Sequence, residues 1–408
     1  MNIIIIDHYA GSPTLGMEFR PYYLGKEWVK MGHKVTIIGA SFSHLRKVQP
    51  NLGKETIDEI KYIWIKTNRY SGNGIGRVIS MLIFVTKLYL NAKKIAKSIN
   101  PDFVIASSTY PLDIYPARRI SKFVKEKKSK LIFEVHDLWP LSPIELGGYT
   151  PKHPFIKVMQ AAEDYAYKNV DAVVSILPKA FSHMSDHGLS KDKFFYIPNG
   201  IVVEDWSYPL PLGLKHYELI QNLHLQNKFI VGFAGAHGTA NSLQSIIDAV
   251  ARIELNNVAL VLVGTGQEKN NLIKYVKDKE IKNVYFLEPI NKLMIPSLLK
   301  EMDVLYVGLQ KQSLFRFGIS PNKIFDYMMS SKPIIQAIEA GNNLVRDADC
   351  GIDVEPECVD EIASAILEIQ ALSVQDRSRM GENGHNFVFK NHTYDILGKR
   401  FIKIMQSI

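Results

Sequence analysis

Short apolar runs alternate with amphipathic segments along the whole chain. Apolar runs bounded by turn-forming residues are typical of buried strands, and the segments between them carry apolar residues at helical spacing. This alternation indicates βαβ units around parallel sheets, and therefore an α/β fold. The predicted strands are residues 2–6, 34–38, 61–65, 103–106, 130–134, 172–175 and 195–197 in the first half, and 229–234, 259–263, 284–287, 304–306, 333–336 and 353–355 in the second.

A turn-rich stretch separates the two sets of strands. Pro198, Asn199 and Gly200 are followed by Pro209 and Pro211, without the period of a helix or a strand. We therefore predict two doubly wound Rossmann-like domains that face a cleft, over residues 1–205 and 206–390. Residues 391–408 have apolar side chains at helical spacing and are expected to form a helix that packs back toward the first domain.

Length and composition agree with two cores. The chain has 408 residues, 46% of them hydrophobic, and a single core rarely serves a chain of this length. Only Cys350 and Cys358 are present, which argues against a disulfide framework or a Cys/His zinc site and favours a reducing compartment. The first residues do not resemble a signal peptide. A cytoplasmic protein is therefore expected.

Positive charge is concentrated in the first half. Residues 1–205 contain 28 Lys and Arg against 19 Asp and Glu, whereas residues 206–408 contain 21 against 22. A basic first half favours an anionic partner such as nucleic acid, an anionic lipid or a phosphorylated substrate. Because no basic motif with interleaved aromatic residues is recognised, nucleic acid is the poorest of these candidates.

Residues 77–99 predict an amphipathic helix. One face gathers Met81, Phe84, Val85, Leu88, Ala92, Ile95 and Ile99, and the opposite side has Lys87, Lys93, Lys94 and Lys97. This pattern suits a helix that lies in the plane of a membrane surface. It equally suits a helix that packs on a core and turns its lysines to solvent. A second cluster of lysines, at 122, 125, 127, 128 and 130, is expected to end a helix.

Five motifs occur in order along nearly the whole chain: residues 31–35 (MGHKV), 136–140 (HDLWP), 197–200 (IPNG), 263–266 (VGTG) and 320–328 (SPNKIFDYM). Together they resemble the GT-B glycosyltransferases of the retaining family 4 type. The second and the last motif are similar to the subgroup that transfers N-acetylfucosamine and related amino sugars in O-antigen and capsule synthesis. The resemblance implies a GT-B fold and sugar transfer from a UDP-sugar.

The resemblance places the donor in the second half. Ser320 and Pro321 suit the start of a helix whose free amides hold a phosphate, and Lys323 adds a positive charge beside it. The family's ribose-binding glutamate matches Asp326, and a carboxylate can accept two hydroxyl donors. The other predicted donor contacts in this half are Gly235, His237, Gly264, Gly266, the main chain of Leu287, and Asn322. In the first half, Gly16 lies in a glycine loop after the first strand, where backbone can approach a diphosphate closely.

The sequence departs from the family pattern at two places. Gly318 stands where a glutamate usually contacts the transferred sugar, and the loop of residues 234–241 lacks the usual Arg and Lys. Neutralisation of the diphosphate would then fall on Lys323, loop amides and His237. These departures keep open a subunit that binds nucleotide sugars without catalysis.

In the first half, His136 follows a predicted strand and matches the histidine that contacts the transferred sugar in this family. Asp137 is expected to orient the same loop. Arg20 is expected either to meet an anionic substrate or to pair on the surface. Glu145 lies in a loop expected on the acceptor side.

The resemblance implies transfer with retention, in which the leaving phosphate itself takes the acceptor proton. No cofactor and no metal are expected, because helix termini and basic side chains stabilise the leaving group. The expected acceptor is a polyprenyl-diphosphate-linked saccharide, and the enzyme is expected to bind the anionic inner face of the cytoplasmic membrane peripherally. A GT-B epimerase is the other enzymatic alternative, although the carboxylates it would need are not evident.

Overall fold

The computed structural model describes residues 1–16, 18–124, 128–253 and 257–408, and these form two compact units. The first unit comprises Met1–Asn199, Phe317–Ser320 and Tyr394–Ile408, and the second comprises Gly200–Arg316 and Pro321–Thr393. The predicted boundary at residue 205 lies a few residues late. The Ile201 amide donates to the His392 carbonyl at 2.8 Å, which ties residue 201 to the second unit.

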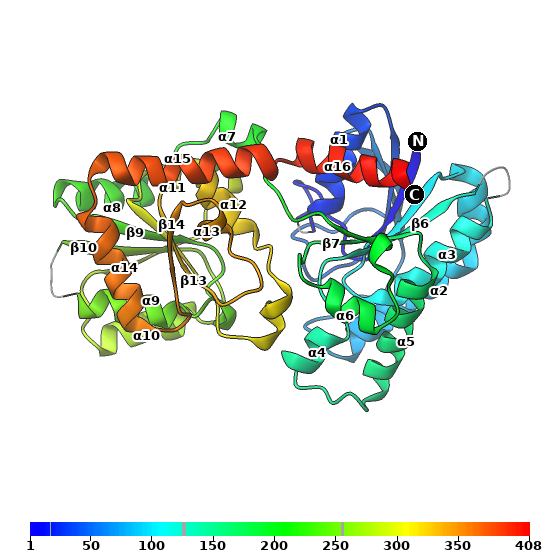
Figure 1. Ribbon diagram of the computed structural model, residues 1–408, viewed down its shortest axis with the longest axis horizontal. Helices are drawn as coiled ribbons and strands as arrows, with labels where there is room; N and C mark the ends of the chain where they lie inside the picture. Colours follow the sequence, from blue (N-terminus) through cyan, green and yellow to red (C-terminus); the bar gives the residue numbers. More distant parts are fainter. Residues whose placement is uncertain (17, 125–127, 254–256) are drawn as a thin grey trace. The chain divides into compact units, whose positions relative to one another are not determined.

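The first unit is built on an eight-stranded sheet of order β3-β4-β2-β1-β5-β6-β7-β8 (Figure 1). All neighbouring strands are parallel except the antiparallel pair β3 and β4. Its strands are β1 (Asn2–Ile6), β2 (Lys34–Ala40), β3 (Gly53–Ile57), β4 (Ile60–Ile65), β5 (Phe103–Ala106), β6 (Lys130–Val135), β7 (Ala172–Ser175) and β8 (Phe194–Tyr196). Its helices are α1 (Arg20–Lys30), α2 (Ile75–Ile99), α3 (Ile114–Lys122), α4 (Leu141–Glu145), α5 (Pro154–Asn169), α6 (Phe181–Asp186) and α16 (Tyr394–Ser407).

The second unit is built on a parallel six-stranded sheet of order β11-β10-β9-β12-β13-β14. Its strands are β9 (Phe229–Ala234), β10 (Val258–Val263), β11 (Val284–Leu287), β12 (Val304–Gly308), β13 (Ile334–Ala337) and β14 (Gly351–Val354). Its helices are α7 (Glu204–Ser207), α8 (Leu214–Leu225), α9 (Leu243–Arg252), α10 (Lys269–Asp278), α11 (Ile295–Lys300), α12 (Asn322–Met329), α13 (Leu344–Asp347), α14 (Val359–Ala371) and α15 (Val374–Asn391).

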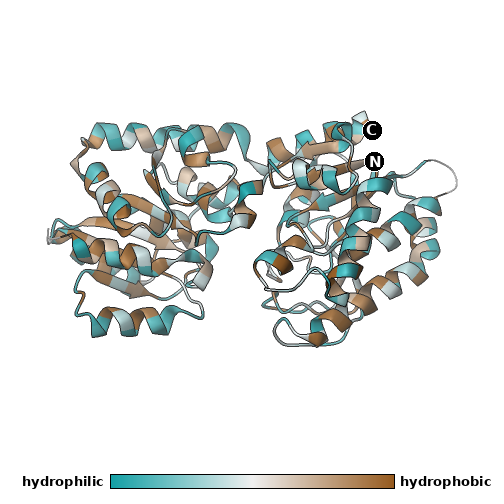
Figure 2. Ribbon diagram, turned by 60° about the horizontal axis from the view of Figure 1, so that its bottom comes forward, coloured by the Kyte–Doolittle hydropathy of each residue, from teal (hydrophilic) through white to brown (hydrophobic). Residues whose placement is uncertain are grey.

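The central strands of each sheet are buried on both faces, as those of parallel sheets covered by helices are. Every residue of β9 and β10 is buried, and the strands stand out as hydrophobic in Figure 2. In both sheets the strand order reverses next to the first strand of the unit, between β1 and β5 and between β9 and β12. Ligands of doubly wound folds bind at the carboxyl ends of strands beside such a reversal. The predicted class, with two Rossmann-like α/β domains, is confirmed.

The sequence analysis missed β3. Its residues GKETI are largely exposed, because it is an edge strand that pairs only with β4 among the described strands. It therefore lacks the apolar run that marks the buried strands. The C-terminal helix α16 belongs to the first unit, where Phe401 packs edge-on against Trp28 of α1, with ring centroids 5.1 Å apart.

Helix α2 is long and apolar enough to cross a membrane by length and composition, and among the described residues no other helix is. The apolar face is packed inside the first unit, because Met81, Phe84 and Leu88 are buried. Of the two alternatives, this is the helix that packs on a core and turns its lysines to solvent. The outer face presents the lysines together with exposed apolar side chains, which are Ile75, Ile79, Leu82 and Leu90. Of the second lysine cluster, Lys122 ends α3, and Lys125 and Lys127 lie outside the described residues.

Candidate active site

A buried polar cluster lies at the carboxyl ends of β5 and β6 in the first domain. The Ser107 hydroxyl donates to Glu134 Oε2 at 2.6 Å, and His136 Nε2 lies 3.3 Å from the same oxygen and 2.9 Å from Ser107 Oγ. Burial opposes the charge on His136, but the hydrogen bond and the charge of Glu134 outweigh it and raise the pKa of the imidazole. Burial likewise opposes the charge on Glu134, yet Arg20 and His136 hold its pKa at about 2.

Arg20 lies inside the first domain, whereas it was predicted either to meet an anionic substrate or to pair on the surface. Its side chain is 3% exposed, and its Nε atom pairs with Glu134 Oε1 at 3.0 Å. Its other nitrogens donate to the carbonyls of Pro198 at 2.6 Å and Ile197 at 3.0 Å. The prediction of an acceptor contact or a surface pair is therefore wrong. A buried cation needs internal partners, and Arg20 instead holds Glu134 in the orientation that meets His136.

Asp7 was not singled out by the sequence analysis. It follows β1 directly, its Oδ1 atom accepts from the Tyr9 amide at 2.9 Å, and its Oδ2 atom has no hydrogen-bond partner among the described residues. Burial and the charge of Glu18 raise its pKa to about 8. A neutral carboxyl group beside the His136 cluster is typical of a functional site, because such sites perturb pKa values. The only sequence signal was its position after a buried strand.

The loop after His136 is held by Asp137. Its carboxylate accepts from the Leu138 amide at 2.9 Å, from Trp139 Nε1 at 3.2 Å and from the Ser142 hydroxyl. Asp137 thus orders the loop into α4, which Glu145 ends. Contacts of these two residues with an acceptor stay predictions.

Gly16 lies in a loop that packs against the backbone of Arg46 and Lys47. Its φ is +111°, and a Cβ added there would lie 2.9 Å from the Lys47 amide nitrogen. Only glycine fits this backbone comfortably. The requirement for glycine therefore has an internal cause, and the predicted contact with a diphosphate stays a prediction.

In the second domain, the loop after β9 (residues 235–241, the β9 loop) and the loop after β10 (residues 264–268, the β10 loop) interlock. The His237 amide donates to the Thr265 carbonyl at 2.9 Å, and the Glu268 amide donates to the His237 carbonyl at 2.9 Å. A Cβ on Gly264 would lie 1.8 Å from the Gly235 carbonyl oxygen, and one on Gly266 would lie 2.3 Å from the His237 carbonyl oxygen. These glycines allow the two loops to touch.

Lys269, which the sequence analysis missed, connects the β10 loop to the end of β11. Its buried ammonium group donates to the carbonyls of Gly264 at 2.9 Å and Leu287 at 3.1 Å, and pairs with Glu288 Oε1 at 2.8 Å. The Leu287 carbonyl also accepts from the Gly264 amide at 3.2 Å. This carbonyl is therefore engaged within the protein, and a base contact by the main chain of Leu287 stays a prediction.

Lys323 lies in the first turn of α12 and reaches the β9 loop. Its Nζ atom donates to Asn241 Oδ1 and lies 4.5 Å from the ring centroid of Phe233. An ideal Cβ on Gly235 would be 3.5 Å from the same atom. Desolvation lowers the pKa of Lys323 to about 8, and no carboxylate within the described ranges forms an ion pair with it. A desolvated ammonium group without a counter-ion is suited to bind an anion.

The start of α12 differs from its prediction. Pro321 is the N-cap residue, and the helix begins at Asn322. The Ser320 hydroxyl does not cap the helix but accepts from the Asn199 amide at 2.9 Å, and the Ser320 carbonyl accepts from Asn199 Nδ2 at 3.0 Å. These bonds hold Ser320 within the first unit. Asn322 is exposed at the first helical position.

The surroundings of His237 favour its neutral form. Its side chain is fully buried between Phe233 and Phe286, and neither ring nitrogen has a hydrogen-bond partner among the described residues. Burial, together with the charges of Lys269 and Lys323, lowers its pKa to about 4. In this chain His237 packs between the interlocked loops, and the predicted help in neutralising a diphosphate stays a prediction.

Asp326 lies one turn further along α12, near the ion pair between Asp205 and Lys292, whose atoms are 2.8 Å apart. Burial raises the pKa of Asp326 to about 6, although Lys292 opposes the shift. The carboxyl group is therefore largely ionised at neutral pH. It can accept hydroxyl donors in that form.

Two family models match most of the chain. The model for Glycosyltransferase Family 4 matches residues 15–205, and the model for Glycosyl transferases group 1 matches residues 228–371. The chain belongs to the group 1 glycosyltransferases of GT-B fold. The colanic acid biosynthesis glycosyl transferase WcaI of Escherichia coli (strain K12) is 21% identical over 258 residues, which are 62% of this chain and 62% of the relative.

Solved structures agree with this assignment of the fold. Sucrose-phosphate synthase of Thermosynechococcus elongatus superposes with a TM-score of 0.75 at 15% identity, over 99% of this glycosyltransferase and 98% of the synthase. The Anabaena protein Alr3699/HepE, solved in complex with UDP and glucose, superposes with a TM-score of 0.66 at 15% identity over the whole of both chains.

The backbone conformation explains why glycine stands at position 318 of the glycosyltransferase. Its φ is +102°, a conformation that side-chain-bearing residues rarely adopt. The backbone here is fixed on both sides, because the Lys179 amide donates to the Phe317 carbonyl at 2.9 Å and Ser320 is bound to Asn199. A glutamate at this position would be strained.

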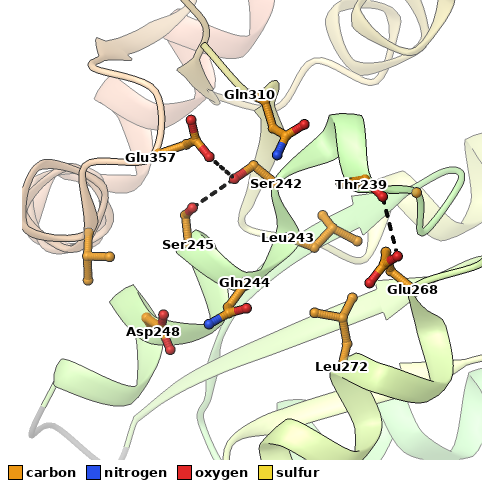
Figure 3. A pocket seen from close by; sticks show the side chains of 12 residues that line it. Thr239, Ser242, Leu243, Gln244, Ser245, Asp248, Glu268, Leu272, Gln310 and Glu357 are labelled. Carbon is orange, nitrogen blue, oxygen red and sulfur yellow. Dashed lines mark hydrogen bonds between the residues drawn. The ribbon is translucent and has the colours of Figure 1, made fainter. Parts of the chain in front are cut away.

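A polar cavity of about 310 Å³ adjoins the β9 loop of the glycosyltransferase at the start of α9 (Figure 3). Ser242 links Glu357, at 3.2 Å, to Ser245, at 3.0 Å, and Thr239 donates to Glu268 at 3.3 Å. The carboxylates that line it are Asp248, Glu268 and Glu357. An acidic cavity does not suit a diphosphate, so this cavity does not replace Lys323 as the predicted contact of the diphosphate.

Proposed function

We propose that this glycosyltransferase transfers a sugar from a UDP-sugar to a polyprenyl-diphosphate-linked saccharide, with retention of the anomeric configuration, in the synthesis of a surface polysaccharide. The transferred sugar is proposed to be an N-acetylated amino or deoxyamino sugar. The observation that carries the proposal is Lys323, a desolvated ammonium group in the first turn of α12 without a carboxylate partner in the described part of the chain. The diphosphate of a nucleotide sugar supplies the anion that this position requires.

The two domains would divide the substrates between them. The second domain would hold the diphosphate with Lys323 and the amides of the first turn of α12, and Asp326 would accept the ribose hydroxyls. The first domain would offer His136 to the sugar and the loop held by Asp137 to the acceptor. Support for UDP comes from the structural relative HepE, which was solved with UDP and glucose. Support for a lipid-linked acceptor comes from the basic first half and from the exposed lysines and leucines of α2.

Catalysis would rest on charge stabilisation at the leaving diphosphate. A positioned cation and helix amides stabilise developing negative charge without reorganisation. The proposed reaction therefore needs no metal and no cofactor. Turnover should persist in a chelator without added Mg²⁺ or Mn²⁺, and a loss of turnover that either ion restores would contradict this part of the proposal.

The deciding experiment measures UDP release from UDP-sugars, with and without a lipid-linked saccharide. Release that depends on the acceptor supports the proposed transfer. Binding of UDP in a thermal-shift assay without any release would indicate a non-catalytic subunit, which Gly318 and the lack of Arg and Lys in the β9 loop favour as the second candidate. Conversion of the UDP-sugar without release of UDP would indicate an epimerase.

A further inference from the structure

Three potential metal ligands, Glu163, His183 and His187, lie together between α5 and α6 of the first domain, and Asp164 pairs with His187 beside them. The two helices are labelled in Figure 1. Glu163 and Asp164 are neighbours on α5, and His183 and His187 are four residues apart at α6, which places them on one helical face. His183 Nε2 lies 3.0 Å from Glu163 Oε1, and His187 Nδ1 lies 2.8 Å from Asp164 Oδ1. The two imidazole rings are 4.6 Å apart between centroids.

Polar atoms from three residues of this cluster surround one nitrogen atom. Gln160 Nε2 lies 2.7 Å from Glu163 Oε2, 2.8 Å from Asp164 Oδ1 and 3.0 Å from His187 Nδ1. The two hydrogens of this amide can be donated to the two carboxylates, and His187 Nδ1, which lies 2.8 Å from Asp164 Oδ1, can donate its own hydrogen to Asp164. Two carboxylates and an imidazole therefore face one centre, and Gln160 Nε2 occupies the position that a cation could take.

The cluster also has the outer support that metal ligands need. Glu163 is 1% exposed, and its Oε1 atom accepts a hydrogen bond from the Tyr167 hydroxyl at 2.8 Å. Such bonds orient a ligating carboxylate. His187 and Asp164 are 29% and 37% exposed, so an ion can reach the ligands from solvent.

We propose that Glu163, Asp164, His183 and His187 bind a divalent transition-metal ion of the zinc class. Two imidazoles and two carboxylates supply four ligands for a tetrahedral site, whereas Mg²⁺ and Ca²⁺ prefer oxygen ligands alone. The Gln160 side chain would rotate away when the ion binds. None of the four ligands belongs to the proposed donor or acceptor groups, so the ion would be structural, distinct from the metal-free transfer reaction.

The place of the site in the fold suggests what the ion would stabilise. The His183 ring packs edge-on against Phe317, with centroids 5.8 Å apart, and the Lys179 amide just before α6 donates to the Phe317 carbonyl at 2.9 Å. Phe317–Ser320 directly precedes α12, which carries Lys323. An ion bound between α5 and α6 would fix the position of α6. Residues 317–320 contact α6 and Lys179, so the ion would stabilise this segment as well.

The test titrates Co²⁺ into the full-length chain without a histidine tag, after treatment with a chelator. The expected result is one equivalent of bound Co²⁺ with the intense visible spectrum of tetrahedral coordination, displaced by Zn²⁺. A double variant, His183→Ala with His187→Ala, should lose the spectrum and the rise in Tm that Zn²⁺ produces. The matched control replaces two histidines of the second domain, His224→Ala with His385→Ala, and should retain both.

The single variant His187→Gln covers the case in which the double variant does not fold, because its side chain is partly exposed. It should fold, as judged by circular dichroism, and bind Co²⁺ at least about tenfold more weakly. An octahedral spectrum, no stoichiometric binding by the wild-type chain, or unchanged binding by the variants would overturn the proposal. Metal binding is measured without UDP release. A negative result would therefore reject the metal site and would not bear on the proposed sugar transfer.

Discussion

His136 Nε2 lies 3.3 Å from Glu134 Oε2, while the other oxygen of the same carboxylate pairs with Arg20 at 3.0 Å. One buried carboxylate therefore connects a structural cation to the histidine proposed to face the donor sugar. Arg20 holds the carboxylate ionised, and the ionised carboxylate favours the protonated imidazole.

Glu134→Gln should lower the pKa of His136, because the charge and hydrogen bond that raise it are removed. NMR titration of the imidazole measures this directly. Since the folded-state pKa of His136 is raised, its contribution to stability is present in full below the unfolded pKa near 6.5 and is lost as the pH rises through the folded pKa. Denaturant unfolding should be measured below the unfolded pKa and above the folded pKa of His136. The free energy of unfolding should lose this contribution at the higher pH in the wild-type chain and not in the variant.

The same substitution should also lower the free energy of unfolding by about 3–5 kcal/mol at neutral pH, because it leaves the Arg20 charge buried without its partner. Lys30→Ala on the surface of α1 is the control, since its ion pair with Glu27 is partly exposed and contributes little. An unchanged pKa of His136 in Glu134→Gln would show that the carboxylate does not tune the imidazole.

Lys323→Ala should lower kcat/KM for UDP release by about 10²–10³-fold, the range for the loss of one group that stabilises developing charge. Lys323→Arg keeps the charge but changes its reach, so it should recover part of the activity. Lys277→Ala, on the exposed side of α10, is the control and should behave as the wild type. Near wild-type turnover of Lys323→Ala would remove this lysine from the mechanism.

Affinity for a UDP-sugar should rise with pH as Asp326 ionises, around pH 6, because the charged carboxylate accepts two ribose hydroxyls more strongly than the neutral acid does. Asp326→Asn should bind about 10–100-fold more weakly at neutral pH, the range for a lost bond to a charged group, and its affinity should not follow this titration. Isothermal titration with UDP-N-acetylglucosamine is suitable, since its diphosphate does not titrate in this range. Equal pH profiles for the two proteins would argue against ribose binding by Asp326.

The outer face of α2 should bind anionic vesicles at low salt, and the binding should weaken as salt screens the lysines. Leu82→Glu with Leu90→Glu should abolish cosedimentation, because both side chains are exposed on this face. Leu225→Glu, on a leucine of α8 that is even more exposed, is the control. Cosedimentation that persists in the double variant would place the membrane contact elsewhere or point to a soluble acceptor.

The sequence predicted all the buried strands with few errors, because a parallel strand covered on both faces requires a continuous apolar run. It missed β3, whose exposed edge position imposes no such run. It also assigned donor contacts to residues 320–328 and to glycines at the ends of strands, and these contacts stay predictions. The backbone geometry of a tight turn does restrict the residue type locally, which is why the glycines can be recognised.

The partners of charged side chains could not be predicted in this way. Arg20 and Glu134 are 114 residues apart, and Lys269 meets the carbonyl of Leu287 from another strand end, so only folding brings them together. The sequence alone determined the α/β class, the two domains and the family, because these depend on local periodicity and short motifs. The tertiary structure decided that Arg20 is internal, that His237 is neutral and that Glu163, His183 and His187 meet, because burial and charge act through distances in space.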